Sequence, residues 1–136
     1  RLSLNNCDSA KKVHLVGYQK DPEIYLKAVD FFVHASTEEG ESNVINEALS
    51  CGLPCIIPYT DVYSRQVLDS CGLRFRSNNK ISLCEQILKI ISNKKLIFEM
   101  GNSGRMHIMA TRSPLIVAKR YSSNLRKVAS FPPNLK

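Results

Sequence analysis

Two carboxylates eight positions apart, Glu39 and Glu47, are the side chains of this chain best suited to bind a ligand. Glu39 precedes a glycine in a polar loop, and Glu47 lies in a short helix expected at residues 42–51. Carboxylates accept hydrogen bonds from sugar hydroxyls, and charged acceptors form the stronger bonds. At the helix start, outward-pointing N–H groups of Ser42 and Asn43 would bind phosphate. The arrangement therefore suits a sugar nucleotide, with one acid for the hexose, one for the ribose and the helix start between them.

The helix expected at residues 42–51 has a polar face and an apolar face. Its polar residues recur at the spacing of one helical face, and its apolar residues occupy the opposite one. The polar face carries Asn43, Asn46, Glu47 and Ser50, and the apolar face carries Val44, Ile45, Ala48 and Leu49. Glu47 should therefore point away from the core, near the carboxyl edge of the sheet where ligands bind in α/β folds. The alternative is that the acids are solvated side chains, stabilised by the helix dipole, that bind nothing.

Strands and helices are expected to alternate along the chain. Short apolar runs predict strands, and apolar residues at helical spacing predict helices. The strands are expected at residues 13–16, 31–35, 55–57 and 73–75, and the helices at 21–30, 42–51, 64–69, from 82 onward, 94–110 and from 114 onward. This alternation predicts an α/β fold with a parallel sheet, followed by C-terminal helices. Residues 1–136 are expected to form one domain without an internal repeat.

Charge and cysteine content limit the partners and the compartment. The net charge of +7 comes from dispersed lysines and arginines. Because they do not gather with aromatic residues in one run, we expect no nucleic-acid binding. The charge suits a diphosphate ligand or an anionic membrane surface, or it is a general property without a function. Five cysteines without a redox or zinc spacing are typical of buried thiols in a reducing compartment, which favours the cytoplasm.

Several short segments between residues 13 and 54 follow one another in an order that resembles a known family. They are a strand ending at Gly17, a helix ending at Asp30, the strand Phe31 to Ser36, Glu39-Gly40, Glu47-Ala48-Leu49-Ser50-Cys51-Gly52 and Leu53-Pro54. This order resembles the donor-binding, C-terminal domain of retaining glycosyltransferases with the GT-B fold, whose two facing domains are Rossmann-like (glycosyltransferase family 4, glycosyl transferases group 1). The resemblance extends over residues 13–128 and is strongest over 13–58.

The resemblance implies a role for each matching residue. Glu39 would bind hydroxyls of the transferred hexose and is the candidate catalytic residue. Glu47 would bind the ribose hydroxyls, N–H groups of residues 40–43 would hold the sugar and diphosphate, and residues 17–18 would lie against the nucleobase. The donor-binding residues implied are Gly17, Tyr18, Ser36, Gly40, Glu41, Ser42, Asn43 and Glu47.

The resemblance also implies the reaction and its setting. A hexosyl group would pass from a UDP- or GDP-sugar to a glycan or lipid-linked acceptor, with retention of the anomeric configuration. The transfer would need neither a metal ion nor another cofactor. The implied location is the cytoplasm, with peripheral contact at the cytoplasmic face of the membrane.

One departure from the family lies directly after the strand at residues 55–57. The family has a Gly-Gly and a Pro-Glu there, whereas this chain reads Thr60-Asp61-Val62-Tyr63-Ser64-Arg65-Gln66-Val67. Glycine permits close approach of the backbone. We therefore expect Tyr63 and Ser64 to crowd or reshape the donor pocket.

The other departure is at the start of the chain. The family's donor domain begins with two strand–helix units, which carry an arginine and a lysine for the diphosphate, and an acceptor domain precedes them. Nothing before residue 13 matches these parts. We therefore expect a partial domain that is inactive by itself. In the strand order 3-2-1-4-5-6, the absent strands would separate residues 13–16 from residues 31–35, which then either stay apart or pair directly.

Two other functions remain open at this point. A non-catalytic remnant or interaction module with the same fold would explain the substituted Gly-Gly and Pro-Glu positions, although the retention of Glu39 and Glu47 argues against it. A sugar-nucleotide epimerase of the same two-domain architecture carries a comparable ribose-binding acid. The segment from Glu39 to Pro54 fits the transferases better.

Overall fold

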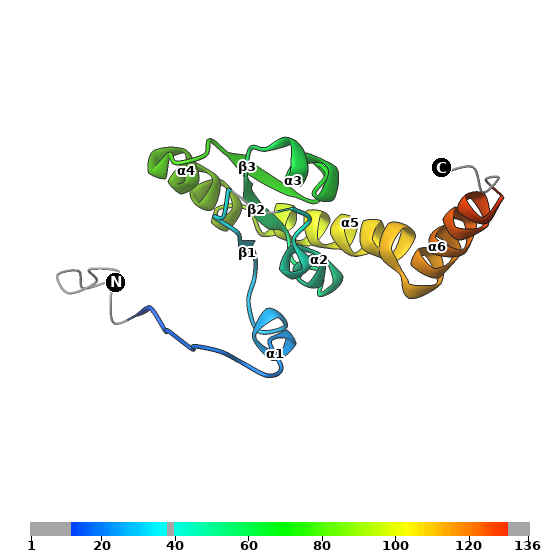
Figure 1. Cartoon of the computed structure of the whole chain (residues 1–136). Helices are drawn as coiled ribbons and strands as arrows, with labels where there is room; N and C mark the ends of the chain where they lie inside the picture. Colours follow the sequence, from blue (N-terminus) through cyan, green and yellow to red (C-terminus); the bar gives the residue numbers. More distant parts are fainter. Residues whose placement is uncertain (1–11, 38–39, 131–136) are drawn as a thin grey trace.

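The fold was obtained as a computed structural model that describes residues 12–37 and 40–130 (Figure 1). Its elements are α1 (Glu23–Leu26), β1 (Phe32–Val33), α2 (Asn43–Ser50), β2 (Cys55–Pro58), α3 (Asp61–Gln66), β3 (Gly72–Phe75), α4 (Lys80–Ile91), α5 (Lys94–Arg112) and α6 (Pro114–Ala129). Strands alternate with helices up to α4, and two further helices follow. The predicted α/β fold with C-terminal helices is confirmed.

The strands form a parallel sheet in the order β1-β2-β3. The central strand β2 is buried along its whole length. Because side chains alternate between the two faces of a strand, Cys55 and Ile57 pack with residues of α2 and α3, whereas Ile56 packs with residues of α4 and α5. The sheet is therefore covered by helices on both faces, as parallel sheets require.

The strand predicted at residues 13–16 does not form. Residues 13–19 have no regular secondary structure, and Leu15 is 80% exposed. Figure 1 shows this segment, in blue, extending from α1 away from the sheet. A strand needs a hydrogen-bonding neighbour, and β1 pairs only with β2 within the described part of the chain. Direct pairing of residues 13–16 with β1, the alternative expected from the sequence, is therefore also wrong.

Two predicted helices have different bounds in the structure. The helix predicted at residues 21–30 ends at Leu26, which is the only buried residue of α1. With Val29 about half exposed, no buried contact holds a further turn. The helix predicted from Ser64 begins instead at Asp61, because the Oγ1 atom of Thr60 accepts a hydrogen bond from the N–H of Tyr63 at 3.3 Å and caps it.

We expect the Thr60→Ala substitution to lower the free energy of unfolding by about 1 kcal/mol, because it removes this cap. Thr60→Ser keeps the hydroxyl acceptor and should lie within about 0.5 kcal/mol of wild type. Urea denaturation of the three proteins measures the difference. Equal losses in both variants would show that the methyl group of Thr60, and not the cap, is responsible.

Helix α4 differs from its prediction in both start and orientation. It begins at Lys80 and not at Ser82, because the Oδ1 atom of Asn79 accepts a hydrogen bond from the N–H of Ser82 at 2.9 Å. The chain contains two apolar stripes at helical spacing, and the structure buries the one formed by Leu83, Ile87 and Ile90. The sequence predicts an apolar stripe of Cys84, Ile87, Leu88 and Ile91, but of these only Ile87 packs against the core, and the other three are exposed. Periodicity alone does not distinguish two neighbouring stripes of the same helix.

Helix α6 extends from α5 to the far end of the molecule (Figure 1). The sequence predicts that the apolar residues Val117, Tyr121, Leu125 and Val128 lie on one side of this helix. However, α6 has no buried residue, and Tyr121, Leu125 and Val128 are each at least 66% exposed. Within residues 12–37 and 40–130, none of the helices is long and apolar enough to cross a bilayer.

Candidate functional site

The predicted site lies where β1 leads through a polar loop into α2. The start of α2 and the carboxyl end of β1 lie at the same edge of the parallel sheet, which is the ligand-binding edge of α/β folds. Gly40 is exposed and Ser36 is half-buried in this loop. Glu39, the candidate catalytic residue, lies outside the described residues.

Helix α2 is oriented as its sequence pattern predicts. Ile45, Ala48 and Leu49 are fully buried against the sheet, whereas Asn43 and Glu47 are exposed. Packing of the apolar face therefore turns the carboxylate of Glu47 toward solvent. Gly52 follows the helix with φ of +79°, the left-handed conformation expected of a residue that ends a helix.

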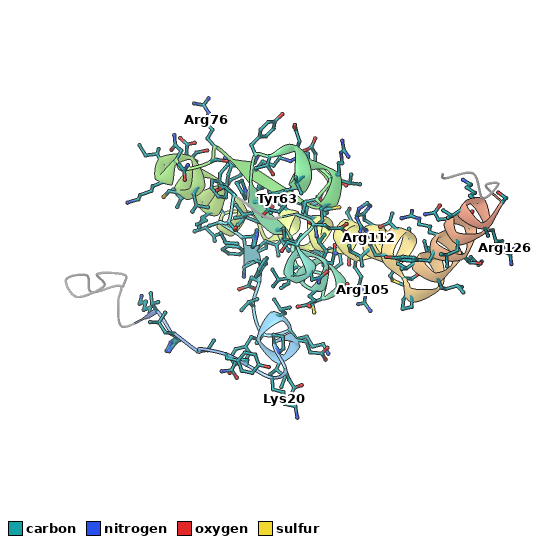
Figure 2. All side chains as sticks on the ribbon, viewed as in Figure 1. Lys20, Tyr63, Arg76, Arg105, Arg112 and Arg126 are labelled. Atoms are coloured by element: carbon teal, nitrogen blue, oxygen red, sulfur yellow. The ribbon has the colours of Figure 1, made fainter. Side chains whose placement is uncertain are left out.

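A cavity of about 510 Å³ lies between the polar face of α2 and the segment that enters α1. Its α2 wall is formed by Glu47, Ser50 and Cys51, and its other wall by residues 20–24. Lys20, labelled in Figure 2, belongs to this second wall. The cavity thus has the carboxylate of Glu47 in one wall, and one lysine, Lys20, with two further acids, Asp21 and Glu23, in the other.

A smaller cavity of about 350 Å³ lies between the start of α2, the helix α3 and the end of α5. Its charged lining residues include Glu41, Arg65 and Arg112. Arg112, labelled in Figure 2, forms an ion pair with Glu41, which ties the loop before α2 to the last turn of α5. Neither Arg65 nor Arg112 was predicted from the sequence, because only the fold brings α3 and the end of α5 to this loop.

The N–H group of Ser42 does not point outward as predicted. It donates a hydrogen bond to Oε1 of Gln66 at 3.2 Å, and Ser42 is only 5% exposed. The N–H of Asn43, the next residue, has no acceptor among the described residues, and Asn43 is exposed. An anion at the start of α2 would therefore meet Asn43 and not Ser42.

Gly17 and Tyr18 are not in either cavity. Gly17 has φ of +62°, and Tyr18 is 94% exposed. Both belong to the extended segment at residues 13–19, and the lining of the 510 Å³ cavity begins at Lys20. Their predicted contact with a nucleobase remains a prediction.

The expected crowding of the pocket by Tyr63 and Ser64 does not occur. Tyr63 is fully buried, and its hydroxyl lies 3.1 Å from Nε2 of His34, with the two rings edge to face. The hydroxyl of Ser64 donates to the carbonyl oxygen of Thr60 at 2.8 Å. These residues turn inward because Thr60 starts α3 early, which directs Tyr63 toward β1.

Four cysteines in the described part of the chain are free thiols. Cys55 and Cys71 are fully buried, as predicted, whereas Cys51 is half-buried and Cys84 is exposed. Burial and the charge of Cys71 raise the pKa of Cys55 to about 12. Cys55 is therefore a neutral core residue at physiological pH and not a nucleophile. Cys7 lies outside the described residues.

Comparison with known proteins identifies a matching family and several relatives of this chain. The model of a family described as "Glycosyl transferases group 1" matches residues 2–93. The alpha-monoglucosyldiacylglycerol synthase of Acholeplasma laidlawii is 30% identical over 101 residues, which are 72% of this chain and 25% of that protein. A Campylobacter jejuni enzyme, the N-acetylgalactosamine-N,N'-diacetylbacillosaminyl-diphospho-undecaprenol 4-alpha-N-acetylgalactosaminyltransferase, is 33% identical over 90 residues, 63% of this chain and 24% of that protein. The chain thus spans about a quarter of the length of these relatives.

Solved structures agree with the fold. Sucrose-phosphate synthase from Thermosynechococcus elongatus superposes with a TM-score of 0.74 at 22% identity, covering 79% of this chain and 27% of that chain. The C-terminal domain of a glycosyl transferase group 1 family protein from Francisella tularensis superposes with a TM-score of 0.66 at 16% identity, covering 75% of this chain and 53% of that chain. At these identities the likeness shows the fold alone.

Proposed function

This chain belongs to the glycosyl transferases group 1 family, and from that membership we propose that it binds the nucleotide-sugar donor of a retaining glycosyltransferase. The donor would be a UDP- or GDP-sugar, and a hexosyl group would pass to a glycan or lipid-linked acceptor. The observation that carries the proposal is the cavity of about 510 Å³ whose α2 wall presents Glu47.

The cavity and the adjacent start of α2 offer polar groups for the two polar parts of a nucleoside diphosphate, which are its ribose and its diphosphate. The carboxylate of Glu47 would accept hydrogen bonds from the two ribose hydroxyls. Asn43, whose N–H has no acceptor among the described residues, lies one helical turn before Glu47 and outside the cavity lining, at the helix start where the dipole would attract the diphosphate. The opposite wall carries the ammonium group of Lys20 together with the carboxylates of Asp21 and of Glu23, which pairs with Lys27. The carboxylate of Glu47 would thus hold the ribose, and the start of α2 and Lys20 would hold the diphosphate.

The proposed reaction places little covalent chemistry on this chain. Its residues would hold the donor and stabilise the negative charge that develops on the departing diphosphate, by the helix start and by nearby cations. The hexose would lie toward the loop that contains Glu39, whose proposed contact with sugar hydroxyls follows from the family pattern. We propose no metal ion in this step.

The acceptor is proposed from the relatives. The names of the two relatives contain a diacylglycerol and a diphospho-undecaprenol, which are both lipids. A lipid-linked acceptor would place this chain at the cytoplasmic face of a membrane.

Calorimetric titration with UDP, GDP and ADP tests the donor proposal. We expect saturable binding of UDP or GDP by the chain, and weaker or no binding of ADP. If none of the nucleotides binds, the donor proposal fails for this chain. A non-catalytic interaction module with the same fold would give that result.

We also propose that α6 contacts an anionic membrane surface. Between residues 114 and 129 the chain has four basic residues, Lys119, Arg120, Arg126 and Lys127, and no acidic one. The opposite side of the helix carries the exposed stripe of Tyr121, Leu125 and Val128. A helix with an apolar face and a basic face lies in the plane of a membrane surface, with its apolar side among the lipids.

We expect the chain to sediment with vesicles that contain phosphatidylglycerol and to bind pure phosphatidylcholine vesicles much more weakly. Leu125→Glu should lower the affinity by roughly tenfold or more, because a buried leucine contributes about 2 kcal/mol. Leu88→Glu, on the exposed side of α4, is the matched control and should bind as wild type does. Equal loss in the two variants, or equal binding to both kinds of vesicle, would contradict the role of α6.

A further inference from the structure

Gln66, the last residue of α3, reaches across to the start of α2. Its side chain is almost fully buried, with 2% of the residue exposed. Oε1 accepts the N–H of Ser42 at 3.2 Å, and Nε2 donates to the carbonyl oxygen of Ser42 and to Oδ1 of Asn46 at 2.9 Å. One amide group therefore satisfies both backbone groups of Ser42 and also contacts the polar face of α2.

These contacts define the orientation of the Gln66 amide. The N–H of Ser42 faces Oε1, and two acceptors, the carbonyl oxygen of Ser42 and Oδ1 of Asn46, face Nε2, so the oxygen and the nitrogen of Gln66 cannot exchange places. Among side chains of this length, a carboxylate offers acceptors only, and an ammonium offers donors only. The site thus requires the amide in particular, and not merely a polar residue.

We propose that Gln66 is a positioning residue of the donor site, an inference that rests on the function proposed above. It holds Ser42 as the residue that starts α2, and it occupies the N–H of Ser42. An incoming diphosphate is thereby directed to Asn43, the next residue, whose N–H has no acceptor within the part of the chain that the structure describes. Through Ser42 and Asn46, Gln66 also fixes the position of the turn of α2 that carries Glu47.

A second contact, from α5, supports the same segment. Arg112 of α5 forms an ion pair with Glu41, the residue before Ser42. The pair is partly exposed, with Arg112 33% and Glu41 46% accessible, so solvent weakens it. The bond from the buried N–H of Ser42 to Gln66 has no such competition, because its loss leaves this N–H without a partner among the described residues, whereas the carbonyl oxygen of Ser42 also accepts the N–H of Asn46 at 3.4 Å. Gln66 should therefore matter more than Arg112 for the position of Ser42.

The test compares Gln66→Met with wild type and with Gln86→Met. Methionine keeps the length of the side chain but makes none of the three hydrogen bonds. Gln86 of α4 is half-buried and has no side-chain hydrogen bond among the described residues, so it is the matched control. In Gln66→Met, we expect the N–H of Ser42 to exchange with deuterium at least about tenfold faster, and UDP or GDP to bind about tenfold more weakly. Gln86→Met should change neither.

A second variant, Gln66→Glu, separates positioning from general destabilisation. Its carboxylate still accepts the N–H of Ser42 but cannot donate to the carbonyl. Burial raises the pKa of such a carboxyl, and its protonated form regains one donor. The affinity of Gln66→Glu relative to wild type should therefore rise as the pH falls from 8 to 5. The ratio for Gln66→Met should stay constant over the same range.

The outcomes distinguish this inference from the proposed function. If wild type binds no nucleotide, the proposed function fails, and exchange of the Ser42 N–H still decides whether Gln66 holds the start of α2. If Gln66→Met exchanges this N–H as slowly as wild type, the positioning role is wrong. It is also wrong if Gln66→Met accelerates exchange but binds nucleotide with wild-type affinity. A pH-independent ratio for Gln66→Glu would likewise overturn the need for an amide.

Discussion

In the Glu47→Ala variant, we expect the affinity for UDP or GDP to fall by at least about tenfold, and by about a hundredfold if both ribose hydroxyls are bound. A hydrogen bond to a charged group contributes about 1.5–3 kcal/mol, and each 1.4 kcal/mol corresponds to a factor of ten. The fold should be unaffected, because Glu47 is exposed on α2 and its side chain makes no hydrogen bond or ion pair within the described residues. Calorimetry of the variant and of wild type measures the loss.

A modified ligand identifies the group that Glu47 binds. Wild type should bind 2′-deoxy-UDP about tenfold more weakly than UDP, whereas Glu47→Ala should not distinguish the two, since the partner of the hydroxyl is already absent. Glu99→Ala removes an exposed acid of α5 that pairs with Lys95, and it should bind as wild type does. If Glu47→Ala still prefers UDP over the deoxy ligand as strongly as wild type, Glu47 does not bind the ribose.

The part of the site that the sequence predicted is the part made by local patterns. The apolar spacing of Ile45, Ala48 and Leu49 both defined α2 and determined which way Glu47 points. Gly52 then marked the end of the helix. Each of these signals lies within a few residues of the feature it predicts, and the packing in the structure agrees with it.

The part of the site that was not predicted from the sequence depends on contacts between segments that are distant along the chain. Gln66 lies 24 positions after Ser42, and Arg112 lies 71 positions after Glu41, so no periodicity or spacing connects them. The prediction of a strand at residues 13–16 was wrong for a similar reason. An apolar run indicates a tendency to form a strand, but the strand forms only beside a paired neighbour. Among the described residues, β1 has one neighbour, and that is β2.

We expect Gly101→Ala to destabilise the chain by about 2–3 kcal/mol, although alanine is the better helix former. A Cβ atom on Gly101, in the middle of α5, would lie 2.1 Å from the carbonyl oxygen of Gly52. Overpacking typically costs about 1–3 kcal/mol, and here the clash is with backbone that cannot rotate away. Alanine in place of glycine returns only about 1 kcal/mol of helix propensity. The clash should therefore exceed the gain, and urea denaturation should give a lower midpoint.

Gly104 provides the comparison that separates the two effects. A Cβ atom there would lie 2.7 Å from Cδ2 of Leu49, the end of a flexible side chain that can move. Gly104→Ala gains the same helix propensity at a smaller steric cost, so it should be less destabilising than Gly101→Ala. A stabilised Gly101→Ala would show that α5 can shift away from α2 without loss. Gly52 ends the helix that carries Glu47, so the clash that Gly101→Ala creates with Gly52 would also displace the proposed donor site. Nucleotide affinity should therefore fall in Gly101→Ala more than in Gly104→Ala.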